Sequence, residues 1–172
     1  MAGRSNLTSL ARLIVSLEVC IAIGCSNVFF ARSLSPTWFA KLELPVFLPP
    51  YQYLIPVTLF IYLILGFVLY LIWQVVSRTD LRDKMRCIVL LCFTLTLMGM
   101  WAYLFFDFES PFMGVMIGAL VVAMLMATMV QAVRVSFGAA ILLFPAVILV
   151  FFAAYANYLI VLLNPSLPII GV

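Results

Sequence analysis

The sequence predicts an all-α integral membrane protein, a bundle of five transmembrane helices forming a single transmembrane domain over residues 1–172. Three observations support this prediction. The chain is 67% hydrophobic and 9% charged, whereas soluble domains average about 45–50% apolar and about 25% charged residues. Five apolar runs each reach the roughly 20 residues that a helix needs to cross a bilayer. These runs are continuously apolar rather than alternating, which favours helices over a β-barrel.

The five helices are expected at residues 10–30, 53–76, 87–106, 112–133 and 138–163. All connections are short except the first. The polar stretch RTDLRDKMR is expected to form the turn between the second and third helices. The sequence DFESP closes the third helix and begins the fourth, where Pro111 suits the first turn of a helix. The stretch RVSFG links the last two helices.

The basic residues predict the orientation of the chain. Arg4 and Arg12 before the first apolar run could also mark a secretory signal, but Glu18 inside that run favours a retained helix. The positive-inside rule places the more basic side in the cytoplasm. The N-terminal side carries Arg4, Arg12, Arg78, Arg82, Lys84, Arg86 and Arg134, and the opposite side carries Arg32 and Lys41. We therefore expect an inside N-terminus and an outside first loop in a bacterial cell membrane.

The composition argues against several classes of function. Cys20, Cys25, Cys87 and Cys92 lie in apolar runs without zinc-ligand spacing, and the chain has no histidine. We expect four small buried side chains and no metal, while a disulfide stays open. Without histidine, the usual general base and the usual haem ligand are both missing, so no enzyme is expected. A net charge of +3 is too small and scattered to indicate a nucleic-acid partner.

The first loop is unusually rich in proline, with Pro45, Pro49, Pro50 and Pro56 within sixteen residues. Proline fixes φ and stops helices, and it pushes the preceding residue towards extended geometry. Residues 31–53 are therefore expected to form a rigid lid rather than a slack linker. Aromatic side chains give this lid an apolar underside, namely Trp38, Phe39, Phe47 and Tyr51.

The proline and aromatic pattern resembles the translocator protein family, also called TspO/MBR, tryptophan-rich sensory proteins or peripheral benzodiazepine receptors. The family hallmark W-Y-x-x-L-x-K-P-x-W-x-P-P, followed by P-V-W-x-x-x-Y, is matched in large part. The matching residues are Trp38, Phe39, Leu42, Pro45, Phe47, Pro49, Pro50, Pro56, Val57, Thr58 and Tyr62. Further likeness lies in Gly66, Tyr70, Leu71 and Trp73, in WAYLFF from Trp101, and in Pro145, Phe152, Ala153, Asn157 and Tyr158.

The chain departs from the family pattern at several positions. Phe47 and Thr58 stand where the family has tryptophan, Met98 replaces an asparagine, and Ile117 replaces a frequent acidic residue. No basic residue follows Tyr158 closely enough for the family's sterol-recognition pattern. This is therefore expected to be a divergent member with a less polar pocket.

The resemblance implies a cavity among the helices that binds hydrophobic planar molecules, such as porphyrins, other tetrapyrroles or sterol-like compounds. Binding would serve sensing or transport, with lipid as the surrounding partner and a possible homodimer. No bound cofactor is expected beyond a porphyrin or another intermediate of haem synthesis as ligand. The resemblance also leaves a bacterial or mitochondrial outer membrane open as the location. The candidate ligand-binding residues are Trp38, Phe47, Leu54, Thr58, Met98, Trp101, Leu120, Leu149, Ala153 and Asn157.

Three alternatives stay open at this point. The chain could have lost ligand binding and serve as an interaction subunit of a membrane complex, which the departures at Phe47, Thr58 and Met98 favour. Glu18 is a possible intramembrane polar site, because a charge in mid-membrane is costly and tends to face a cavity, or its carboxyl could be neutral or reach towards the interface. Gly114 and Gly118 form a GxxxG motif that suits helix packing within the bundle or across a dimer.

Overall fold

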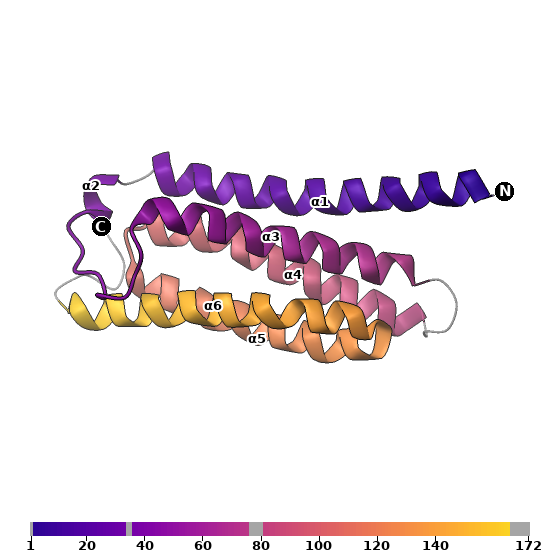
Figure 1. Cartoon of the computed structure of the whole chain (residues 1–172). Coiled ribbons are helices and arrows are strands. Elements are labelled where there is room, and N and C mark those ends of the chain that lie inside the picture. Colours follow the sequence, from indigo (N-terminus) through magenta and orange to yellow (C-terminus); the bar gives the residue numbers. More distant parts are fainter. Residues whose placement is uncertain (1, 34–35, 76–80, 166–172) are drawn as a thin grey trace.

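The computed structural model describes residues 2–33, 36–75 and 81–165 of the chain. This part of the chain is all helical, with five long helices lying along one another and a short helix at one end of the bundle (Figure 1). The five long helices are each long and apolar enough to cross a membrane, so the predicted five-helix membrane bundle is confirmed. The helices are α1 (Ala2–Ser33), α2 (Pro36–Phe39), α3 (Tyr51–Gln74), α4 (Leu81–Phe106), α5 (Pro111–Val135) and α6 (Phe137–Leu163).

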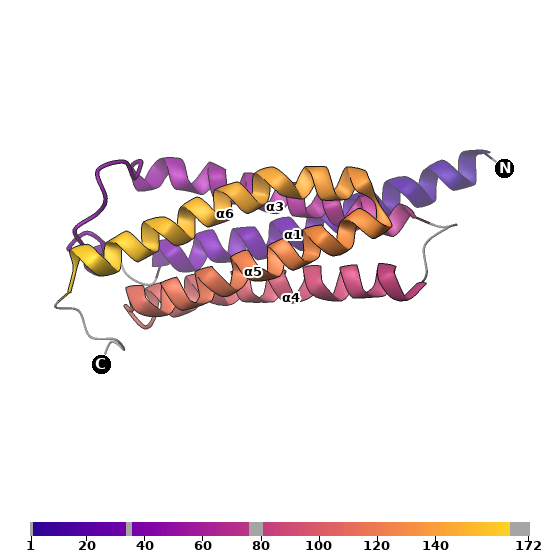
Figure 2. The same ribbon diagram turned by 90° about the horizontal axis from the view of Figure 1, so that it is seen from below.

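The long helices form a closed ring in an order that differs from their order along the chain. Helix α1 packs against α3 and α4, α3 packs against α6, and α5 lies between α6 and α4 (Figures 1 and 2). The ring therefore runs α1, α3, α6, α5, α4 and back to α1. Short connections explain the neighbouring pairs α4–α5 and α5–α6, whereas the pairs α3–α6 and α1–α4 are tertiary contacts.

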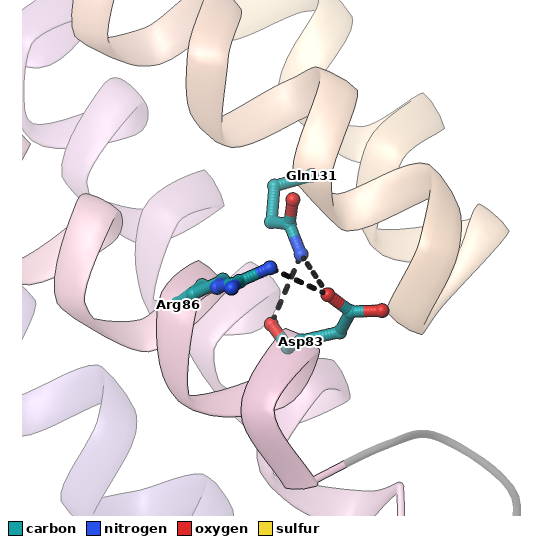
Figure 3. A network of polar contacts seen from close by, with 3 residues as sticks. All are labelled: Asp83, Arg86 and Gln131. Carbon is teal, nitrogen blue, oxygen red and sulfur yellow. Dashed lines mark hydrogen bonds and ion pairs between the residues drawn. The ribbon is translucent and has the colours of Figure 1, made fainter.

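Several helix boundaries differ from the sequence prediction because polar residues continue a helix. The first helix, expected over residues 10–30, runs from Ala2 to Ser33. The expected turn RTDLRDKMR is helical from Leu81, six residues before the predicted start at Cys87. Its first turn is held by α5, since Gln131 Nε2 donates to Asp83 Oδ1 at 3.1 Å and to the Asp83 carbonyl at 3.3 Å (Figure 3). Arg86 adds an ion pair to Asp83 at 3.6 Å.

The link between α5 and α6 is a single residue, shorter than the stretch RVSFG suggested. The backbone N–H of Ser136 donates to the carbonyl of Ala132 at 2.7 Å and closes α5. The hydroxyl of Ser136 then accepts from the N–H of Ala139 at 3.3 Å and caps α6. One serine with extended backbone geometry thus ends one helix and caps the next. Serine is a preferred N-cap residue because its hydroxyl accepts from a free N–H of the first turn.

The interior is filled with aliphatic side chains in the half of the bundle away from α2. Leu65 and Ile72 of α3, Leu91 of α4, Leu125 of α5 and Leu143 of α6 are all fully buried. Because these side chains come from four of the five long helices, their packing holds those helices together in this half of the bundle. The expectation of four buried cysteines is wrong in part: Cys20 and Cys87 are buried, whereas Cys25 and Cys92 are exposed on outward helix faces.

Candidate functional site

The loop between α1 and α3 is built from successive turns and lies across one end of the bundle (Figure 1). After α2, the N–H of Lys41 donates to the carbonyl of Trp38 at 2.9 Å, and the N–H of Leu48 donates to the carbonyl of Pro45 at 2.9 Å. Within the loop, the side chains of Leu42 and Pro45 are buried. The side chain of Tyr51, expected on the underside, lies outside the described part.

A cluster of aromatic rings joins the first part of the loop to α4. Phe105 and Phe106 are buried, and Trp38, Phe39 and Trp101 pack around them half-buried. Trp101 stacks on Phe105 with ring centroids 5.3 Å apart, and Trp38 meets the same ring edge-on at 5.6 Å. Such pairs add stability beyond the area that they bury. The cluster brings together the predicted site residues Trp38 and Trp101.

The second part of the loop is held by α6. The ring of Phe47 lies edge-on to Phe152 at 5.3 Å and stacks on Tyr155 at 6.2 Å. Close by, the side-chain amide of Asn164 binds the backbone of one loop residue, Glu43, on both sides of its Cα. Its Oδ1 accepts from the N–H of Glu43, and its Nδ2 donates to the carbonyl of Glu43, both at 2.9 Å. The first part of the loop is thus held by α4, and the second part by α6.

Beneath the loop, α6 leaves an inward position uncovered. Val150, Ala153 and Asn157 follow one another at three- and four-residue spacing and so share one helix face. Val150 and Asn157 are buried, yet Ala153 between them is exposed. Neighbouring helices therefore cover this face of α6 less completely at Ala153 than one turn before or after it.

A similar gap in burial is found on α3 and on α4. On α3, Leu54 and Thr58 continue the stripe of Ile61 and Leu65, but they are half-buried whereas the later members are buried. On α4, Trp101 is half-buried although it lies between the buried Met98 and Phe105. These helix faces are therefore less completely covered in the half of the bundle under the loop than in the other half.

The remaining predicted wall residues take different positions. Leu149 is half-buried and packs against the main core, and Asn157 is 6% exposed with its amide in the interior. Met98 is buried, and its carbonyl accepts a hydrogen bond from α1. Leu120 is 40% exposed and lies to one side of the buried stripe of α5. Leu120 thus stands apart from the other candidates.

The sequence left open the roles of Glu18 and of the GxxxG motif, and the structure shows where both lie. Glu18 lies on an exposed face of α1, away from the interior, and none of the described cations pairs with it. A Cβ atom on Gly114 would lie 2.5 Å from the ring of Phe105, and one on Gly118 would lie 3.2 Å from Cβ of Ala154. Both glycines thus pack closely against other helices of the same bundle, which small residues permit.

Two asparagines in the structure were missed by the sequence reasoning. Asn27 is buried on α1, where its amide contacts α3 and α4, and Asn164 holds the loop. A polar residue inside an apolar span is itself a signal of function or packing, so Asn27 was open to prediction. Asn164 carried no such signal, because it follows the last span and meets Glu43 only in the folded chain.

Comparison with known proteins agrees with this architecture. The model of the TspO/MBR family matches residues 16–163. The chain is 32% identical to the tryptophan-rich protein TspO of Archaeoglobus fulgidus over 157 residues, which cover 91% of this chain and 99% of that protein. It is 28% identical to the tryptophan-rich protein TspO of Chlorobaculum tepidum over 154 residues, which cover 89% and 96% of the two chains. A five-helix membrane bundle with an aromatic loop, matched over nearly its whole length, therefore belongs to the TspO/MBR family.

Proposed function

We propose that the protein binds flat hydrophobic molecules, of the tetrapyrrole or sterol-like kind, between its helices and under the first loop. Binding serves sensing or transport, and the protein is a binding protein rather than an enzyme. We further propose that the N-terminus lies on the cytoplasmic side of a bacterial cell membrane, because basic residues at the ends of α4 and α5 gather at the end of the bundle opposite α2. Arg82, Lys84, Arg86 and Arg134 lie at that end.

The observation that carries the proposal is the exposed Ala153 on the inward face of α6. Small side chains at this level leave space, and the half-buried rings of Trp101 and Trp38 offer flat apolar surfaces at the same end of the bundle. Ligand sites are typically concave and mostly apolar, with few polar groups. The loop excludes water from such a site because Phe47 and Asn164 hold it against α6. Family membership supports the proposal, since both relatives carry the name tryptophan-rich protein TspO.

Titration of the purified protein with protoporphyrin IX tests the proposal. The fluorescence of the three tryptophans reports binding, with free tryptophan as the inner-filter control. We expect saturable quenching in the micromolar range that persists in Trp73→Phe, because Trp73 lies at the opposite end of α3. Ala153→Phe should abolish it by filling the space, while Ala123→Phe, on an exposed face of α5, should not. Equal quenching in Ala153→Phe and wild type would mean that the proposed site is wrong.

One observation favours a second candidate, an interaction subunit without a ligand. Thr58 stands where the family has tryptophan, and its hydroxyl donates to the carbonyl of Leu54 at 2.9 Å within α3. At the position of the family's asparagine, Met98 is buried and presents no polar side chain. This candidate predicts quenching no different from free tryptophan and no thermal stabilisation by porphyrin or sterol.

A further inference from the structure

Three helices meet at a buried polar contact that the proposed ligand site has not yet used. Asn27 of α1 is 6% exposed, and Tyr62 of α3 is fully buried. Asn27 Nδ2 donates to Tyr62 Oη at 2.5 Å and to the carbonyl of Met98 on α4 at 2.8 Å. Because a carbonyl oxygen only accepts, the contact with Met98 identifies the nitrogen of the amide. The amide oxygen must therefore point away from α4.

This contact leaves one acceptor and one donor without partners. Asn27 Oδ1 is buried and accepts no hydrogen bond in the described part of the chain. Tyr62 Oη accepts from Asn27, and its own proton meets no acceptor among the same residues. Buried polar groups are nearly always paired, because an unpaired one loses its hydrogen bonds to water without replacement. Both groups therefore call for a partner that the described part of the chain does not supply.

A single hydroxyl group satisfies both atoms at once. Its proton donates to Asn27 Oδ1, and its oxygen accepts from Tyr62 Oη. Both groups belong to the contact around one amide nitrogen. Because Tyr62 and Asn27 Oδ1 are fully buried, the hydroxyl enters only when neighbouring side chains move aside. An ether or a ketone only accepts and a methyl group does neither, whereas a hydroxyl, like the larger neutral carboxyl and amide groups, does both. A hydroxyl, present in water and in alcohols, is the smallest group that meets both needs through a single heavy atom.

The pair lies directly below the aromatic cluster. Trp101 follows Met98 by one turn of α4, and Ala31 follows Asn27 by one turn of α1 and packs against that cluster. A flat molecule lying on Trp101 would therefore direct one edge towards Asn27. We propose that Asn27 and Tyr62 bind one hydroxyl group at the edge of a flat apolar ligand. This inference rests on the proposed function and names the polar group that its ligand carries.

Two pyrene probes test the inference, 1-pyrenemethanol and 1-methylpyrene, which differ by one hydroxyl group. Each is titrated into protein in phosphatidylcholine nanodiscs, and energy transfer from tryptophan to pyrene reports binding. Empty nanodiscs correct for partition into lipid. We expect the wild-type protein to bind the alcohol roughly 3- to 10-fold more tightly than the methyl compound, the range that one or two neutral hydrogen bonds give.

Variants then assign the preference to the two residues. Tyr62→Phe keeps the ring that packs against Gly24 and removes only the hydroxyl. We expect the ratio of the two affinities to fall towards one. Asn27→Leu, of similar size, should lower the ratio in the same way if Tyr62→Phe folds poorly. Tyr70→Phe is the matched control, because its hydroxyl bonds Ser9 two turns further along α3, and it should keep the wild-type ratio.

The outcomes separate the inference from the proposed function. If both probes bind saturably with equal affinity, or if Tyr62→Phe keeps the preference, the hydroxyl site is wrong and the proposed function stands; Asn27 and Tyr62 then hold water only. If neither probe nor protoporphyrin IX binds, the proposed function fails and the inference fails with it. A preference lost in Tyr62→Phe and kept in Tyr70→Phe supports both.

Discussion

Replacing Asn164 with alanine should release the loop from α6. The substitution removes the two hydrogen bonds that join the side-chain amide to the backbone N–H and C=O of Glu43, each 2.9 Å long. A neutral hydrogen bond contributes about 0.5–1.5 kcal/mol net, and this contact is exposed, so the two together contribute about 1–2 kcal/mol. The population of open loop should therefore rise about 5- to 30-fold.

Hydrogen exchange of the backbone amides measures this opening. The amide of Glu43 is the direct reporter, because it donates to Asn164, and that of Leu48 reports the turn within the loop. Both should exchange faster in Asn164→Ala, while the amides of α3 stay unchanged. Asn164→Asp keeps an acceptor for the Glu43 N–H and should give an intermediate rate. Ser26→Ala, which removes a bond only within α1, serves as the control.

Unchanged protection of both loop amides in Asn164→Ala would refute the reasoning. The contacts of Phe47 with Phe152 and Tyr155 would then be sufficient to hold the loop. Phe47→Ala in the same background distinguishes this case, because it should release the loop if the rings alone hold it.

Three further predictions concern the packing of the bundle. Gly114→Ala should destabilise the protein by about 1–3 kcal/mol, because its Cβ would lie 2.5 Å from the buried ring of Phe105; Gly138→Ala, whose nearest atom is 3.9 Å away, should be close to neutral in the same thermal melts. Ser136→Ala should cost about 0.5–2 kcal/mol through loss of the cap on α6, and an unchanged unfolding midpoint would contradict that role. Gln131→Ala should speed amide exchange in the first turn of α4, which its side chain holds, and leave the rest of α4 protected.

Much of the fold was predictable because lipid restricts what a chain can do. Long apolar runs must satisfy their own backbone groups, so composition alone predicts helices and their number. The ends of the helices were less predictable, because they depend on individual hydrogen bonds, one of them between two helices. Asp83 continues α4 through its bonds with Gln131, and Ser136 serves two helices at once. Neither effect is visible in hydropathy.

The candidate site was predictable only in part. The proline and aromatic pattern predicted a stiff loop, and Trp38 and Trp101 do lie in one aromatic cluster. Glu18, the most unusual residue of the first span, lies on an exposed face instead of in the interior. The polar residue of that span which does reach the interior is Asn27. The direction of a side chain depends on how its helix is rotated in the ring, which an evenly apolar span does not reveal.

The sequence by itself determined the class of protein, the five spans and the family, because these follow from composition and from motifs that are local in the chain. The tertiary structure alone decided which residues share the interior. The ring places α1 beside α4 and α3 beside α6, so Asn27 meets Met98, and Glu43 meets Asn164 across 121 positions of sequence. These contacts arise from the order and rotation of packed helices, and lipid-facing and core-facing side chains are equally apolar, so hydropathy cannot tell the two faces apart.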